Sequence, residues 1–292
     1  MTNFSGTPHR CILEFVAEID WAQLIVTSVG GGAVVKLLDY IHTGYVRKRE
    51  RRETARDVLL KHHDPILKAA DELVGRIRSM AVSDFADFRP AAIAKLEPDV
   101  VLLRKAAAIF YFVQFWARIQ LLRLETSVFA TGSDPAGSRL QKFLQQLESR
   151  SARVVDRAWQ RATGEAILVD TNQGRRPINL YEFAQRYQSD SAFRRWLSPM
   201  AEILESAGTD PAERQRILKY GTVVHALIDT LDPNHVVTTE RDAWPNKLSP
   251  AVRKKLAFGT FREHLPFVPD VRKYTDPKKL EGPRRPADES LE

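Results

Sequence analysis

Two histidines and two aspartates near the end of one predicted helix are the residues whose types and spacing could support chemistry. His225 and Asp229 stand four positions apart, so a helix places them on one face. Asp232 and His235 follow within one turn of the helix exit. Imidazole and carboxylate groups serve as metal ligands and as acid–base catalysts. These four residues are therefore the candidate metal ligands of a metal-dependent hydrolase, and His225 and Asp229 are also its candidate catalytic residues.

A structural explanation of the same residues is stronger. Apolar residues continue along this helix, and Asp232 precedes a proline that stops it. His225 can bond Asp229 directly, and a pair at this spacing without a third placed ligand is a weak metal signal. We therefore favour packing over catalysis and keep the hydrolase as an alternative.

Glu165, next to Gly164 in the stretch TGEAIL, is the third catalytic candidate, because it is a carboxylate that could sit in a pocket. Such a residue more often starts or stabilises a helix. No glycine-rich phosphate loop accompanies the aromatic residues, and the single cysteine, Cys11, leaves neither an internal disulfide nor a zinc site of cysteine spacing. The sequence predicts no cofactor and favours a protein that is not an enzyme.

Helical patterning positions these residues. Apolar residues recur three and four apart between Ile66 and Ile77, a stripe that must be buried. Asp64 and Asp210 each precede a proline, which is the pattern of an N-cap and a first helical residue. A helix from Pro98 to about residue 130 has the aromatic centre AAAIFYFVQFWA, which is too short for a membrane span and typical of a core helix. The expected fold class is all-α, with a multi-helix bundle.

Weaker signals complete the outline of the chain. Further helices are expected over residues 139–161, 180–188, 191–207, 211–230 and 250–258. TGSDPAGS, at 131–138, predicts a turn, whereas ILVD followed by GRRP predicts an extended piece and then a turn. The predicted domains are an N-terminal segment (1–20), a transmembrane helix (21–42), a helical bundle (43–265) and a proline-rich, irregular and flexible tail (266–292).

The transmembrane prediction rests on an apolar run before the bundle. Residues 21–35 carry no charge and would form about 22 Å of helix, against a hydrocarbon core about 30 Å thick. The span lengthens if the Lys36 ammonium reaches back to the headgroups, with Trp21 at the opposite interface. The alternative is a buried helix of a soluble protein.

Small residues within this run bear on the same choice. Gly30, Gly31 and Gly32 each cost a soluble helix about 1 kcal/mol relative to alanine, whereas glycine is more frequent in membrane spans. Thr27 with Gly31, and Ser28 with Gly32, have the spacing that lets two membrane helices approach closely. These four residues predict a homo-oligomer contact. The alternative is that the glycines form a loop, which would exclude the span.

A basic cluster follows the run and predicts its orientation. Residues 47–56 carry six arginines or lysines against two glutamates, whereas residues 1–20 carry one arginine against three acidic residues. By the positive-inside rule, the N-terminus lies outside and most of the chain is cytoplasmic, so the protein is expected in the cell membrane as a single-pass protein. The residues expected to contact membrane or anionic lipid are Trp21, Lys36, Arg47, Lys48, Arg49, Arg51 and Arg52.

The formal net charge of +7 suits anionic lipid and nucleic acid equally well. The favoured function is a membrane-tethered helical scaffold or regulatory interaction protein with a protein partner at the cytoplasmic face. The nucleic-acid alternative uses the helix around residues 47–56 and the patch Arg253, Lys254 and Lys255.

Three stretches carry a diffuse resemblance: WQRATGEAIL at 159–168, FRRWLSPM at 193–200 and ALIDTLDP at 226–233. Together with the N-terminus, they make residues 21 to about 235 resemble a loosely defined group of uncharacterised bacterial proteins with one N-terminal membrane helix and a helical cytoplasmic domain. The resemblance implies a bacterial source and a membrane tether. It implies no reaction and no catalytic residue.

Overall fold

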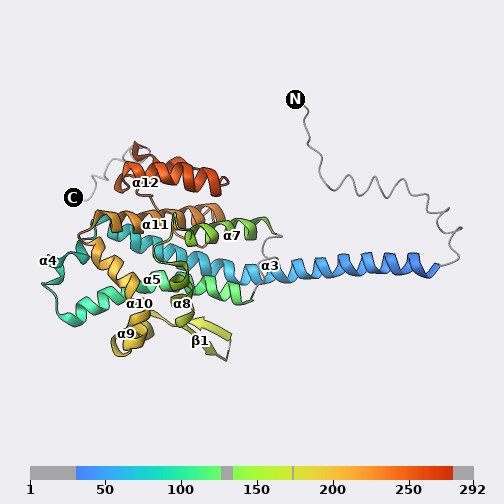
Figure 1. The fold of residues 1–292 in the computed structure, drawn as a ribbon, viewed down its shortest axis with the longest axis horizontal. Coiled ribbons are helices and arrows are strands. Elements are labelled where there is room, and N and C mark those ends of the chain that lie inside the picture. Colours follow the sequence, from blue (N-terminus) through green and yellow to red (C-terminus); the bar gives the residue numbers. More distant parts are fainter. Residues whose placement is uncertain (1–30, 126–133, 173, 279–292) are drawn as a thin grey trace, which may run out of the picture. The chain divides into compact units, whose positions relative to one another are not determined.

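The computed structural model describes residues 31–125, 134–172 and 174–278, which divide between two compact units, residues 1–51 and 52–292. Helices dominate these residues, so the predicted all-α class is confirmed, with one small β-hairpin added (Figure 1). The elements are α3 (Gly31–Val82), η1 (Ala86–Phe88), α4 (Pro90–Ile93), α5 (Pro98–Glu125), α7 (Pro135–Glu148), α8 (Arg157–Ala166), β1 (Leu168–Thr171), β2 (Gly174–Pro177), α9 (Leu180–Ser189), α10 (Ser191–Ala207), α11 (Pro211–Leu231), η2 (Pro245–Lys247), α12 (Pro250–Lys254), η3 (Lys255–Arg262, a π-helix) and α13 (Val271–Thr275).

The apolar stripe of α3 is buried as predicted. It consists of Ile66, Leu67, Ala70, Leu73, Val74 and Ile77, each at most 1% exposed. The predicted helix start at Asp64–Pro65 is wrong, because Pro65 lies inside α3. Leu59 is buried on the other side of the proline. Burial therefore continues across Pro65, which offsets the cost of a proline in a helix interior, about 3 kcal/mol.

Helix α5 forms the centre of the bundle and begins at Pro98, as predicted. Its buried aromatic side chains include Phe110, Phe112, Phe115 and Trp116. The Trp116 indole donates a hydrogen bond of 2.8 Å to the Tyr220 hydroxyl of α11. Burial of large aromatic side chains contributes on the order of 2 to 3 kcal/mol each. The helix thus holds the bundle together.

The described residues do not establish a membrane span. Among them, α5 alone is long and apolar enough to cross a bilayer, and half of its apolar stretch is buried inside the bundle. A core helix passes the same test, and the aromatic packing of α5 favours that interpretation. Residues 21–30 of the predicted span lie outside the described part of the chain, and residues 31–42 form the start of α3, so the span stays a prediction.

Two helices replace the single one expected over residues 139–161. Helix α7 ends at Glu148 and α8 begins at Arg157, after the Asp156 carboxylate accepts a hydrogen bond from the Ala158 amide. Residues 135–138 of the turn expected over 131–138 belong instead to α7, which begins at Pro135 with Asp134 as its N-cap. Aspartate followed by proline was the usable signal there.

The expected extended piece near residue 168 is strand β1, but GRRP is a strand rather than a turn. Strand β2 pairs with β1 in an antiparallel hairpin, with Val169 opposite Arg176 and Asp170 opposite Arg175. An ion pair of 2.8 Å between Arg175 and Asp170 supports the register.

The helices expected over 180–188, 191–207 and 211–230 are confirmed as α9, α10 and α11. Helix α10 retains Pro199 in its interior, and α11 lies beside α7 and α10 (Figure 1). The N-cap of α11 is Asp210, as predicted, and its carboxylate accepts from the Ala212 amide at 2.7 Å.

The first part of the tail predicted to be flexible, up to residue 278, is instead packed on the bundle. Residues 271–275 form α13, and Val268 and Tyr274 are buried against the core. Apolar side chains between the prolines therefore extend the bundle past residue 265. Residues 279–292 lie outside the described part of the chain. The short helix expected over 250–258 is also longer, because α12 continues into the π-helix η3.

Gly208, at the end of α10, allows a close approach to η1. A Cβ at this position would lie 2.0 Å from the carbonyl oxygen of Phe88. We expect Gly208→Ala to lower the free energy of unfolding by about 2 kcal/mol, because backbone must move to admit the methyl group. Urea unfolding measures it. Gly259→Ala is the control, since no atom outside the adjacent backbone of its own helix lies within 4 Å of a Cβ built there. Equal stability of the two variants would contradict the close approach.

Candidate functional site

Three of the four predicted site residues lie together at the end of α11. The Nε2 atom of His225 is 3.7 Å from Oδ1 of Asp229, and Nε2 of His235 is 3.6 Å from the same oxygen. The His225 and Asp229 side chains are 2% and 11% exposed. The predicted placement of His225 and Asp229 on one helix face is therefore confirmed, and His235 lies close to them. The direct bond expected between His225 and Asp229 is not formed, because neither ring nitrogen of His225 has a hydrogen-bond partner among the described residues.

The second carboxylate oxygen of Asp229 binds α13. The Lys273 ammonium lies 2.5 Å from Oδ2, and the Tyr274 hydroxyl donates to the same atom. Burial and the Asp229 charge raise the pKa of Tyr274, so its hydroxyl keeps its proton at neutral pH. The aspartate thus joins the C-terminal helix to α11.

Asp232 has a different role from the other three residues. Its carboxylate accepts backbone hydrogen bonds from Val236, Val237 and Thr238 at 2.9 to 3.0 Å, and a further one from the Thr238 hydroxyl. Burial opposes its charge, but these hydrogen bonds hold the pKa of Asp232 below its ordinary value. Its lone pairs are engaged in shaping the turn after α11, in which His235 has a φ of 51°.

Metal binding has no support from this arrangement. Within residues 31–125, 134–172 and 174–278, no group of three or more His, Cys, Asp or Glu side chains could hold a metal ion. The Lys273 ammonium beside Asp229 would also repel a cation. The arrangement is better explained as a structural junction between α11 and α13.

His225 is a buried imidazole in this junction. Its ring packs on Trp244 and Tyr274, with centroids 5.7 and 5.5 Å apart. Burial lowers the pKa of His225 to about 4, against the opposing effect of the Asp229 carboxylate. The imidazole is therefore neutral at pH 7.

Glu165 does not line any of the pockets described for this structure. It lies on α8, and its side chain is exposed, whereas the neighbouring Gly164 is buried. A Cβ on Gly164 would lie 2.8 Å from the backbone of Trp116. Gly164 therefore allows a close contact of α8 with α5, and Glu165 is an exposed residue beside it rather than a catalytic carboxylate in a cavity.

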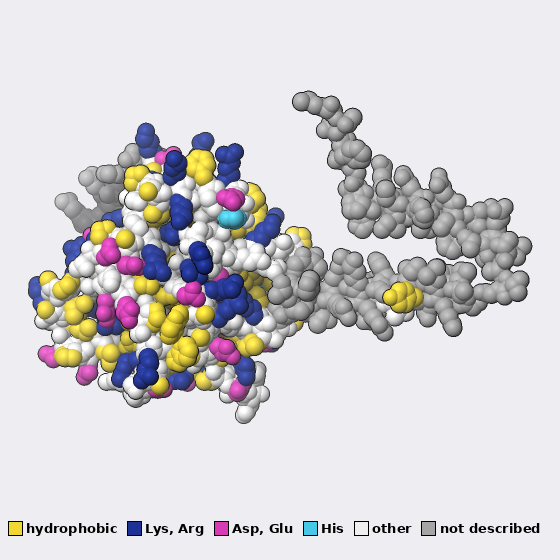
Figure 2. Space-filling view, in the orientation of Figure 1, with side chains coloured by type: hydrophobic (Ala, Val, Ile, Leu, Met, Phe, Trp, Pro, Cys, Tyr) yellow, Lys and Arg dark blue, Asp and Glu magenta, His cyan; other side chains and the backbone are white. Residues whose placement is uncertain are grey.

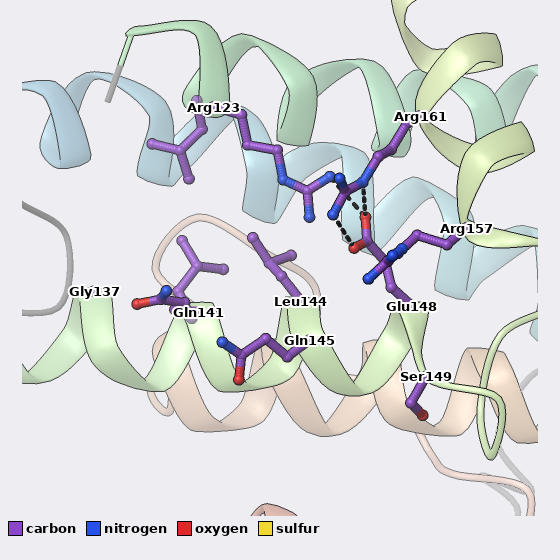
Figure 3. Close-up of a pocket in the computed structure, with 11 residues that line it drawn as sticks. Arg123, Gly137, Gln141, Leu144, Gln145, Glu148, Ser149, Arg157 and Arg161 are labelled. Atoms are coloured by element: carbon purple, nitrogen blue, oxygen red, sulfur yellow. Dashed lines mark hydrogen bonds and ion pairs between the residues drawn. The ribbon is translucent and has the colours of Figure 1, made fainter. Parts of the chain in front are cut away.

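A pocket lined by arginines lies between the end of α5, helix α7 and helix α8 (Figure 3). We refer to it as the arginine pocket. Its volume is about 400 Å³, within the range of small-molecule sites. Its lining residues are Leu122, Arg123, Gly137, Leu140, Gln141, Leu144, Gln145, Glu148, Ser149, Arg157 and Arg161.

Glu148 holds two of the three arginines in place. Arg161 forms a bidentate contact with the Glu148 carboxylate: its Nε donates to Oε1 at 3.1 Å and its Nη2 donates to Oε2 at 2.6 Å (Figure 3). Nη1 of Arg123 lies 2.7 Å from the same Oε1 atom. Burial opposes the charge of Glu148, but the contacts with Arg161 and Arg123 outweigh it and lower its pKa. Glu148 is thus ionised at neutral pH, and both guanidinium groups are oriented.

Arg157 supplies a third positive charge at this site. It begins α8, one turn before Arg161, and its side chain is exposed. Within the described ranges no carboxylate lies within ion-pair distance of it, although the charge of Asp156, which pairs with Arg153 at 2.8 Å, also attracts it. Three guanidinium groups thus face one carboxylate, which leaves a net charge of +2 at the pocket.

The arginine pocket was missed from the sequence. Residues 139–161 were expected to form one helix, on which Glu148 and Arg161 are 13 positions apart and cannot meet. The break in the helix over residues 149–156 lets α8 take a different direction from α7, and Arg161 then contacts Glu148. Asp156, the N-cap of α8, was the local signal for that break.

The side chains predicted to contact a membrane or a second copy of the chain are not described by the structure. Trp21, Thr27 and Ser28 fall outside the described residues. Gly31 and Gly32 begin α3, and Lys36, Arg47, Lys48, Arg49, Arg51 and Arg52 lie along the same helix, where backbone alone is described.

The nucleic-acid alternative loses part of its predicted patch. Arg253 donates hydrogen bonds to the carbonyl oxygens of Pro245 and Leu248, so its guanidinium fixes a loop, whereas Lys254 and Lys255 are exposed. On the face drawn in Figure 2, basic side chains are interleaved with acidic and apolar ones. That face does not offer the continuous basic stripe that tracks a phosphate backbone.

Comparison with known proteins gives no relative for this chain: no family model matches it, and neither the curated proteins nor the solved structures yield a significant match. The resemblance to a bacterial group stays a prediction.

Proposed function

We propose that this protein is a single-pass, membrane-tethered helical scaffold or regulatory protein whose bundle binds a partner at the cytoplasmic face. The observation that carries the proposal is the continuity of α3, which begins at Gly31 and runs without interruption through the basic residues 47–56. Two of the three glycines thus lie in a helix, which weakens the loop alternative. Glycine is tolerated better in a membrane helix than in a soluble one.

The charge distribution supports an orientation with the bundle inside the cell. Six arginines or lysines follow the apolar run within residues 47–56, whereas acidic residues dominate the segment before it. Basic residues near the surface contribute about 1 kcal/mol each to attraction for anionic lipid. The tether therefore combines an apolar anchor with an electrostatic contact.

Membrane fractionation tests the anchor. The full-length chain with a C-terminal tag should stay in membranes after an alkaline carbonate wash, and deletion of residues 1–42 should release it. Release of the full-length chain by the wash would show that residues 21–38 do not span the bilayer.

Cys11, the single cysteine of the chain, tests the orientation. A membrane-impermeant maleimide applied to intact cells should label Cys11, because the N-terminus is expected outside. Cys11→Ser gives the background. Labelling only after lysis would place the N-terminus inside and contradict the proposed topology.

Replacing the basic cluster should change membrane association. With Arg47, Lys48, Arg49, Arg51 and Arg52 all changed to glutamine, we expect altered orientation of Cys11 or a loss of membrane retention, because both the positive-inside signal and the lipid contact are removed. Maleimide labelling of Cys11 measures the orientation, and membrane fractionation measures the retention.

The control variant for the basic cluster also loses five positive charges, but at other positions. It carries glutamine at five exposed basic positions of the bundle: Arg139, Arg150, Lys254, Lys255 and Arg262. Unchanged orientation and retention in both variants would contradict a role for residues 47–52.

A further inference from the structure

We propose that the arginine pocket binds a soluble phosphate monoester of about nucleotide size. The proposal is independent of the membrane tether, because every lining residue belongs to the unit formed by residues 52–292. It assigns a ligand class to a site that no comparison describes.

The charge of the pocket favours phosphate over a single carboxylate. Three guanidinium groups against Glu148 leave a net charge of +2. A phosphate monoester carries about −1.5 to −2 charges near pH 7, whereas a carboxylate carries one. Arginine also binds phosphate oxygens through two parallel hydrogen bonds, a geometry that its planar group fits well.

The arginines are arranged before any ligand enters. The Glu148 contacts engage Nε and Nη2 of Arg161 and Nη1 of Arg123, but each guanidinium has five N–H donors. Donors beyond those on Glu148 thus remain on both groups, and Arg157 adds its own. Groups already oriented lose less conformational entropy when they bind.

The remaining wall indicates an organic group attached to the phosphate. Leu122, Leu140 and Leu144 supply the apolar part of the lining. The side chains of Gln141 and Gln145 provide amide donors and acceptors along α7 (Figure 3). A cavity of about 400 Å³ exceeds what an inorganic phosphate fills. A ring or short chain against the leucines, with polar edges near the glutamines, would occupy the rest.

Titration calorimetry on the purified full-length chain tests the proposal. The probes are the four common nucleoside 5′-monophosphates and phenyl phosphate, with inorganic phosphate and adenosine as the separated halves. At least one ester should bind at least tenfold more tightly than either inorganic phosphate or adenosine. Failure of every ester to bind below about 1 mM, or equal binding of inorganic phosphate, would overturn the proposal.

A variant identifies the site. Arg157→Gln should weaken binding of that ester by about tenfold or more, because one charge-assisted contact is lost. Because Arg157 is exposed, the unfolding temperature of the Arg157→Gln variant should equal that of the parent, which shows that the variant is folded. Arg139→Gln removes an exposed charge from α7 outside the pocket and should change affinity less than twofold. Equal weakening by the two variants would mean general electrostatic attraction and would also overturn the proposal.

Discussion

Replacing Asp229 with alanine is expected to lower the free energy of unfolding by about 3 kcal/mol. Asp229 is 11% exposed and accepts contacts from Lys273 and Tyr274 at one oxygen. Removing it leaves an ammonium and a hydroxyl without their acceptor. Breaking a buried ion pair costs about 3 to 5 kcal/mol, and the lower end applies because the Lys273 side chain, 28% exposed, can reach water.

Equilibrium urea unfolding of the Asp229→Ala variant measures this loss, with a surface ion pair as the control. Asp242 pairs with Arg78 at 3.0 Å, but its side chain is 77% exposed. Asp242→Ala should therefore cost less than about 1 kcal/mol. A similar small loss for both variants would mean that the contact between α11 and α13 contributes little to the fold.

Acid should destabilise the protein through His225. The pKa of this imidazole is about 4 in the folded chain, against about 6.5 in an unfolded one, so the unfolded state binds more protons between these values. The stabilisation is fully present above pH 6.5 and falls as the pH drops toward 4. The total loss is about 3 kcal/mol, from about 1.4 kcal/mol for each pH unit.

The measurement compares the free energy of unfolding at pH 7.5, 5 and 4 for the parent and for His225→Phe, which keeps an aromatic ring without a titrating group. The parent should lose about 3 kcal/mol more than the variant over this range, since the carboxylates titrate in both. His264→Gln, at a half-exposed position, is the control and should follow the parent. Identical acid dependence of His225→Phe and the parent would contradict a buried neutral imidazole.

Local patterns predicted most of the bundle. The stripe from Ile66 to Ile77 and the aromatic centre of α5 were identified because burial of one helix face imposes a regular spacing. Helix starts at Pro98 and Pro211 followed from proline at the first helical position. The same rule failed at Pro65, where burial on both sides keeps the helix continuous, so tertiary packing overrode the local signal.

The sites depended on contacts that no local pattern contains. The proximity of His225 to Asp229 was predictable, because both lie on one helix face. Their junction with Lys273 and Tyr274 was not, since it joins residues more than forty positions apart. The arginine pocket depends in the same way on the break between α7 and α8, because its lining residues come from both helices and from α5.

Pro65 affects how α3 unfolds locally. Because proline has no N–H, it cannot donate the usual hydrogen bond to the carbonyl of Lys61, and the ladder of the helix has a gap there. Hydrogen–deuterium exchange should therefore divide the helix at this point. Amides from about residue 69 to 80, beneath buried side chains, should exchange only in global unfolding, whereas those before Lys61 can open in smaller, independent events. One continuous helix would then behave as two cooperative segments.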